Sequence, residues 1–417
     1  MKGAGFKMVK KIIFMIVVGI VMNSNAHKQE MHQYITKEAY KLLLYSFPNN
    51  LLEMGSFLGS DENCFSGNWP DRSWGAGLIV SGAWDEDESD PVFHYGMLQA
   101  PTYDQTFSLP SAIGPQEAYT SITHFWNPDG GKNSTVALND HTLGVPWSFT
   151  IDENAYLKIK VYANGGYIFR SWYAESRDQP KAFQNYCGDD IGMAYQDFTM
   201  LSIFDLYENK AYYPFDYLNL AATKWYSATC STPITGQKYQ AYEILGRMAH
   251  LLQDMTVPEH VHNDSHGCSH GMRCSMYEDN ELSFTPHCTA EELWNEGFKY
   301  INPYFNSKEN DPLYHLMYCL AQITDHYGSA GKDGDNDYDH QFYLITKNIR
   351  KLGAAQNSND VTVESCEEMH DVLIPLAIRF TAGLMYWFGV ETGMLPKISS
   401  NDNSAEIEPI VNLLLLD

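Results

Sequence analysis

The sequence predicts an all-α protein, a multi-helix bundle with irregular insertions. Three segments carry this prediction because their apolar residues recur at helical spacing: 27–47, 237–255 and 366–390, the last almost wholly apolar over 372–388. Further helices are expected over 195–207, 212–226, 290–300 and 312–326. The only β structure expected is a small hairpin near 147–161, with strands 147–151 and 157–161 around a turn at 152–154.

Composition limits the classes of function. The chain has 417 residues, enough for a large core or two domains, and 44% of them are hydrophobic, as in an ordinary globular protein. No internal repeat or sharp domain boundary is visible. A net charge of −25 works against binding duplex nucleic acid, where neutralisation of phosphates supplies most of the affinity. The charge suits either a cationic ligand or a solvated surface.

Residues 1–26 have the pattern of an export signal. Lysines precede a short apolar run at 12–22, and small residues end the segment at Ala26. Cleavage between Ala26 and His27 is expected, so the protein is predicted to be secreted or periplasmic. We expect no transmembrane segment after it. Export permits disulfides among the eight cysteines, but their spacing assigns no pairs, and the absence of CxxC argues against a structural zinc finger.

The stretch from 246 to 278 is the richest in metal-ligand residue types. Gly246, His250 and Asp254 recur every four residues and so share one helix face, and His260 follows a predicted helix stop at Pro258. Imidazole and carboxylate groups at this spacing suit zinc. Gly246 would let another backbone approach closely. Taken alone, a His and an Asp one turn apart are more often an ordinary polar pair.

Three other segments contain possible ligand residues, but each has an ordinary structural interpretation when taken alone. His124 stands in an aromatic segment before a turn and reads alone as a core histidine. The acidic segment 82–88, with its acids at 85–88, reads alone as a solvated loop. The Gly/Asp-rich segment 328–339 is expected to be a surface loop, because it lacks the regular ligand positions of a calcium loop.

Taken in order, these segments resemble the zinc-dependent phospholipase C family, whose relatives include zinc nucleases that cut single-stranded nucleic acid. The similar elements are the first helix from His32 to Ala39, Gly82 with Asp87, the segment His124 to Asp129, the string His250, Asp254 and His260, and a closing helix with Thr381–Gly383, Trp387 and Phe388. The resemblance implies one catalytic domain over 27–395, followed by a tail at 396–417. Segments of about 131–235 and 300–360 have no counterpart in the family pattern.

The resemblance also implies up to three zinc ions. His27, through its freed α-amino group and carbonyl oxygen, and His32 would hold one ion. Asp254 would bridge it to a second ion held by Asp87, His124 and His250, while His260 and Glu278 would hold the third.

Two positions depart from the family pattern. Residue 27 is His where the family has Trp. Cys274 stands where a His is expected, four positions before Glu278. Either Cys274 ligates directly as a thiolate, or it pairs with Cys268 and His266 or His270 takes its place.

Such a centre could hold a bridging hydroxide and clamp a phosphodiester oxygen, with Asp87 accepting a proton or orienting the water. The predicted function is phospholipase C-like hydrolysis of phospholipid head groups. The spacing of Cys274 from His260 and the acidic charge, which suits a choline head group, favour it. Two alternatives are a zinc nuclease for single strands, favoured by the short interval from His27 to His32, and a non-catalytic zinc-binding relative.

Overall fold

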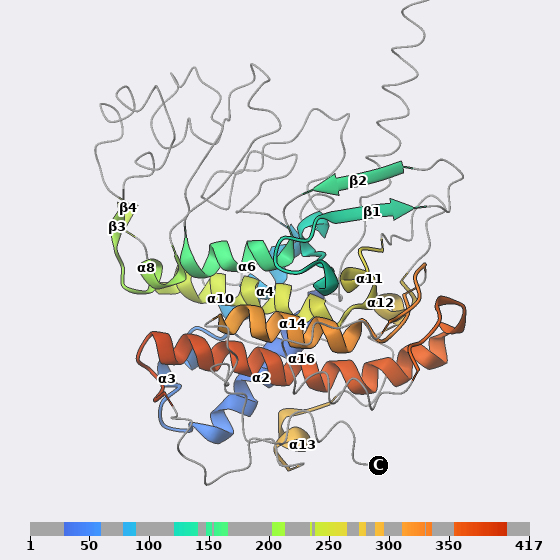
Figure 1. Cartoon of the computed structure of the whole chain (residues 1–417). Coiled ribbons are helices and arrows are strands. Elements are labelled where there is room, and N and C mark those ends of the chain that lie inside the picture. The colour runs from blue at the N-terminus through green and yellow to red at the C-terminus, as the bar shows by residue number, and fades with distance from the viewer. Residues whose placement is uncertain are drawn as a thin grey trace, which may run out of the picture.

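The computed structural model confirms the all-α prediction, since helices form nearly all of the core in its described part (Figure 1). It describes residues 29–59, 78–88, 121–140, 147–151, 154–165, 202–212, 234–235, 238–264, 275–280, 288–295, 311–329, 331–335 and 354–397. The predicted export signal and most of the tail therefore lie outside the described residues.

The described helices follow one another from the first predicted segment to the last. The α-helices are α2 (Gln29–Ser46), α3 (Leu52–Ser56), α4 (Ile79–Glu88), α6 (Ala155–Asn164), α8 (Ile203–Tyr207), α10 (Lys238–Gln253), α11 (Pro258–Val261), α12 (Met276–Asn280), α13 (Ala290–Asn295), α14 (Pro312–Thr324) and α16 (Val363–Glu391). The 3-10 turns are η1 (Ser121–His124), η2 (Pro128–Gly130), η3 (Asp254–Thr256) and η5 (Ser358–Asp360).

Helix α10 lies at the centre of this body, with α6, α14 and α16 running across the view beside it (Figure 1). Every residue from Ala241 to Gln253 is buried. A surface helix would leave its polar face in water, so the polar side chains of α10 need partners inside the protein. The sequence predicted this helix over 237–255, stopped by Pro258. Instead α10 ends at Gln253, η3 follows, and Pro258 begins α11, where a missing backbone N–H costs nothing.

Two glycines let α4 and α10 touch backbone to backbone. A Cβ on Gly246 would lie 1.9 Å from the Ile79 carbonyl oxygen, and one on Gly82 would lie 1.9 Å from that of Glu243. The expected close approach at Gly246 is thus confirmed, and the approaching segment is α4.

The acidic cluster 85–88 is not a solvated loop. It forms the second half of α4, where Glu86 and Asp87 are buried. The apolar residues Ile79, Val80 and Ala83 share that buried side, so α4 lies within the core and carries two carboxylates into it.

The predicted hairpin was half wrong. Strand β2 (Trp147–Ile151) exists, but its antiparallel partner is β1 (Val136–Asp140), with Val136 opposite Ile151 and Asp140 opposite Trp147. Residues 157–161 belong to α6, because their buried neighbours Ala155, Ile159 and Tyr162 recur at helical rather than alternating spacing. A second short pair joins β3 (Ala211–Tyr212) to β4 (Ile234–Thr235).

We expect Asn154→Ala to lower the free energy of unfolding by about 1–3 kcal/mol. The buried Asn154 side chain accepts from Leu157 N at 2.8 Å, which caps α6, and donates to the Ser134 carbonyl oxygen at 2.8 Å. Denaturant titration would measure the loss. Asn154→Ser, which keeps the capping acceptor, should lose less, and equal losses in the two variants would contradict the capping role.

Helix α16 packs against α2, α14, α12 and α10. It starts with a capping box in which Thr362 and Ser365 exchange hydrogen bonds. By length and composition α16 could cross a membrane, contrary to the expectation that no segment after the signal could. However, 89% of its most apolar window is buried inside the protein, which is the pattern of a core helix. Cys319 and Cys366 lie in described segments and are free thiols.

The Gly/Asp-rich loop is described only over 328–329 and 331–335. Gly331 and Asp333 are exposed, as expected of a surface loop, but Ser329 is buried. The Ser329 hydroxyl donates to Asp264 at 2.6 Å, and Lys332 donates to the His262 carbonyl oxygen at 2.5 Å. The loop therefore holds the segment that follows His260.

Candidate metal centre

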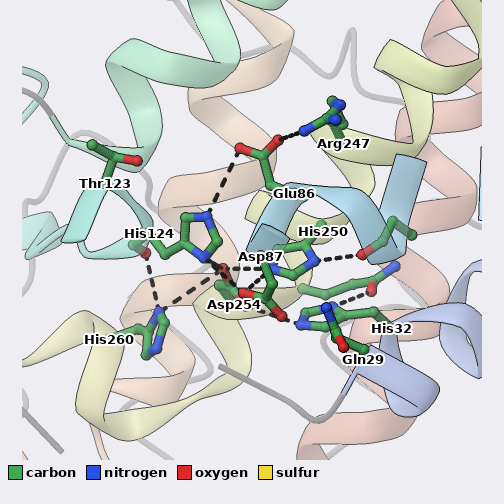
Figure 2. Close-up of polar contacts among 12 residues, drawn as sticks. Gln29, His32, Glu86, Asp87, Thr123, His124, Arg247, His250, Asp254 and His260 are labelled. Carbon is green, nitrogen blue, oxygen red and sulfur yellow. Dashed lines mark hydrogen bonds and ion pairs between the residues drawn. The ribbon is translucent and has the colours of Figure 1, made fainter. Parts of the chain in front are cut away.

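The described members of the predicted ligand set come together at one place (Figure 2). Each comes from a different element, and every one is buried: His32 on α2, Asp87 on α4, His124 on η1, His250 on α10, Asp254 on η3, His260 on α11 and Glu278 on α12. His27, Cys274, His266 and His270 lie outside the described residues, so the choice among the last three stays open.

Four ligand atoms form a closed ring around one point. Asp254 Oδ2 lies 3.2 Å from His124 Nδ1 and 3.4 Å from His250 Nε2. On the other side of the ring, Asp87 Oδ1 lies 3.5 Å from His124 Nδ1 and 3.4 Å from His250 Nε2. Ligands held about 2.0–2.1 Å from a tetrahedral zinc are separated by about 3.3–3.4 Å. The four separations of the ring therefore match those between ligands of one tetrahedral zinc ion.

Asp254 presents its second oxygen to another histidine. Asp254 Oδ1 lies 3.3 Å from His32 Nε2, the same spacing again. The rings of His32 and His250 stack face to face with centroids 3.6 Å apart. Each of the two imidazoles contacts a different oxygen of the Asp254 carboxylate. Asp254 is thus placed to be shared by two neighbouring ions.

A third group lies beyond the ring. His260 Nε2 is 3.7 Å from Glu278 Oε1, and the Phe125 ring stacks on the His260 imidazole with centroids 4.3 Å apart. His260 Nδ1 is 3.9 Å from Asp254 Oδ2, so this pair adjoins the other ligands.

Hydrogen bonds on the far side of three imidazoles select which nitrogen faces the centre. His250 Nδ1 donates to the Ala83 carbonyl oxygen at 2.6 Å, and His260 Nδ1 donates to that of His124 at 3.2 Å. His32 Nδ1 donates to Gln253 Oε1 at 2.8 Å. Each bond keeps the proton on Nδ1 and turns the Nε2 lone pair inward, as a metal-binding histidine requires.

Gln253 is oriented in turn by two threonines. Its amide nitrogen donates to Thr36 Oγ1 at 3.0 Å and to Thr381 Oγ1 at 3.2 Å. The closing-helix motif around Thr381 therefore reaches the centre through Gln253 and His32.

The electrostatics favour a cation at this place. Burial opposes ionisation of Asp254, but His250, His124 and His260 hold its pKa well below the ordinary value. Burial likewise opposes ionisation of Asp87, whose pKa His250, His124 and His32 lower. Burial disfavours the cationic form of His250, yet Asp254 and Asp87 raise its pKa well above the ordinary value. Both carboxylates thus remain charged and attract positive charge.

Several buried atoms of the ring make no hydrogen bond within the described residues. They are both oxygens of Asp254, Nε2 of His250 and both ring nitrogens of His124. Buried polar atoms are rarely left in this state unless they bind an ion or water. The donor set, its spacing and these atoms together fit bound zinc.

Sequence reasoning missed Glu86 and Gln253. Glu86 Oε1 lies 3.8 Å from His124 Nε2 on the side away from the ring (Figure 2). The helical spacing of Ile79, Val80 and Ala83 could have indicated a buried helix through Glu86.

The fold and the site define an all-α protein with a candidate metal centre of several adjoining ligand groups. No protein family, curated protein or solved structure compared with the chain matches it.

Proposed function

We propose that this protein is a secreted zinc-dependent phosphodiesterase with phospholipase C-like activity on phospholipid head groups. The observation that carries the proposal is the ring of four ligand atoms that includes Asp254 Oδ2, with separations of 3.2–3.5 Å. The sequence segments that resemble the zinc-dependent phospholipase C family are the same ones that meet at this ring. Export through the signal at 1–26 and the ligand role of His27 are part of the proposal. So is a ligand that joins His260 and Glu278, supplied by Cys274, His266 or His270.

Bound zinc would supply a Lewis acid for phosphoryl oxygens and lower the pKa of water to about 7. Asp254 would fix the spacing between two ions, because its two oxygens face His32 and His250 separately. Asp87 would ligate and orient water as an acceptor. Its lowered pKa makes it a weak base, so orientation suits it better than proton abstraction.

A zinc nuclease for single strands is the competing function. The same ring would serve it, and the interval of five residues between His27 and His32 favours it (32 − 27 = 5). The net charge of −25 favours a choline head group over a polyanionic strand.

One experiment tests the proposal. The chain starting at His27 is loaded with zinc, its zinc content is measured, and turnover of phosphatidylcholine vesicles and of single-stranded DNA is followed in parallel. We expect zinc-dependent release of phosphocholine that stops with chelator and returns with added zinc. Turnover of DNA alone would assign the nuclease function. Bound zinc with no turnover of either substrate, or no bound zinc, would overturn the proposal.

A further inference from the structure

A buried carboxylate lies directly behind one imidazole of the candidate metal centre. Glu86 Oε1 is 3.8 Å from His124 Nε2, and both side chains have 0% exposure. His124 Nδ1, on the other edge of the same imidazole, faces Asp254 and Asp87 (Figure 2). The three histidines discussed above each have an oxygen behind them at 2.6–3.2 Å, and Glu86 occupies the equivalent place for His124.

Glu86 is held in this place by three donors. Lys158 Nζ lies 2.5 Å from Oε1, while Arg247 Nη1 lies 3.0 Å and the Tyr162 hydroxyl 2.6 Å from Oε2. Lys158 also donates to Thr123 Oγ1 at 2.9 Å, next to His124 in the chain. Lys158 therefore fixes both the Glu86 carboxylate and Thr123, the residue before His124.

The arrangement has a cost that a purely structural role would not require. Lys158, Arg247, Glu86 and Glu243 are all buried, and apolar side chains of similar size would stabilise a core as well as such ion pairs do. Arg247 also has a second acidic neighbour, since Nη2 lies 3.7 Å from Glu243 Oε1. Glu86 is thus not required merely to neutralise Arg247.

Lys158 and Tyr162 lie one turn apart on α6, within the segment 131–235 for which the sequence offered no family counterpart. The inserted segment therefore reaches the back of the metal centre.

We propose that Glu86 is a positioning residue that accepts a hydrogen bond from the Nε2–H of His124 and so presents Nδ1 to the metal, and that α6 supplies Lys158 and Tyr162 to hold Glu86 there. The present 3.8 Å is about 1 Å longer than an N–H···O hydrogen bond, so the proposal requires His124 and Glu86 to move closer when the metal binds. Carboxylates behind metal-bound histidines set the tautomer and strengthen binding. The inference rests on the proposed zinc centre.

The test compares Glu86→Gln with Glu243→Gln in the chain starting at His27. Both variants remove a buried acid beside Arg247, but only the first faces His124. Zinc affinity is measured by competition with a chromophoric chelator, and stability by denaturant titration. The visible absorption spectrum of the cobalt-loaded protein reports the coordination of the metal. We expect Glu86→Gln to weaken one zinc about 10–100-fold and to change the cobalt spectrum, while Glu243→Gln alters stability only.

Equal zinc affinity in Glu86→Gln and the unmodified protein would overturn the inference, as would equal weakening in both variants. No zinc binding by the unmodified protein would overturn the proposed function together with it. If Glu86→Gln does not fold, Lys158→Met is compared with Lys160→Met. Lys160 lies on the same helix but pairs with Asp311 at 3.1 Å, so only Lys158→Met should weaken zinc binding, and unchanged affinity there would equally overturn the inference.

Discussion

Asp254→Asn is expected to remove metal from two neighbouring positions of the proposed centre and to reduce the proposed phosphodiesterase activity to background. The two oxygens of Asp254 face separate histidines, His32 at 3.3 Å and His250 at 3.4 Å. Loss of a group behind a ligand costs about 10–100-fold in metal affinity, and loss of a shared ligand should cost more. Zinc content after dialysis against a weak chelator measures the effect.

The same variant should lose the stabilisation that zinc gives. A ligand at about 1,000 times its dissociation constant stabilises the folded state by about 4 kcal/mol, so chelator should lower the Tm of the unmodified protein more than that of Asp254→Asn. Asp264→Asn is the matched control, because Asp264 bonds to Ser329 and Gly331 rather than to the centre. Retention of zinc and of the chelator response in Asp254→Asn would contradict a bridging role.

Gly246→Ala is expected to lower the free energy of unfolding by about 3 kcal/mol or more. The added Cβ would lie 1.9 Å from the Ile79 carbonyl oxygen and 2.8 Å from Ala83 N, both backbone atoms of α4 that have no free rotation to relieve the clash. Helix α4 must then move away from α10. That movement separates Asp87 from His250 and stretches the bond from His250 to the Ala83 carbonyl oxygen, so zinc affinity should fall as well.

Gly389→Ala is the control for this substitution. Its Cβ would meet Leu395 Cδ1 at 2.7 Å and Cγ at 2.9 Å, which are side-chain atoms rather than backbone, so a smaller shift relieves the clash. Denaturant titration and zinc content of both variants are compared. A loss no greater in Gly246→Ala than in Gly389→Ala would show that the α4–α10 contact does not position the ligands.

The helices could be predicted because their apolar spacing is local. The first, central and last helices lie within a few residues of the expected bounds, since burial of one apolar stripe fixes both period and extent. Strand pairing is not local. Residues 147–151 form a strand as expected, but nothing in their own sequence says that Val136–Asp140 lies beside them rather than 157–161.

The resemblance to a known family implied the ligand set, and the described members of that set do meet. The groups behind them could not be found in this way. Glu86 lies among Asp85, Asp87 and Glu88, where charge predicts exposure, and only the fold supplies Lys158 and Arg247 as its partners. Cys274 and His27 remain predictions.

The distance along the chain between the ligands has a consequence for biosynthesis. His32 and Asp87 leave the ribosome early, whereas Asp254 follows Asp87 by 167 positions (254 − 87 = 167), which takes roughly 10–30 s at about 5–20 residues per second. Until α10 has been made, α4 lacks the helix that Gly82 packs against and that pairs with Glu86 and Asp87. The proposed metal site therefore cannot be complete until the segment that carries Asp254 has been made.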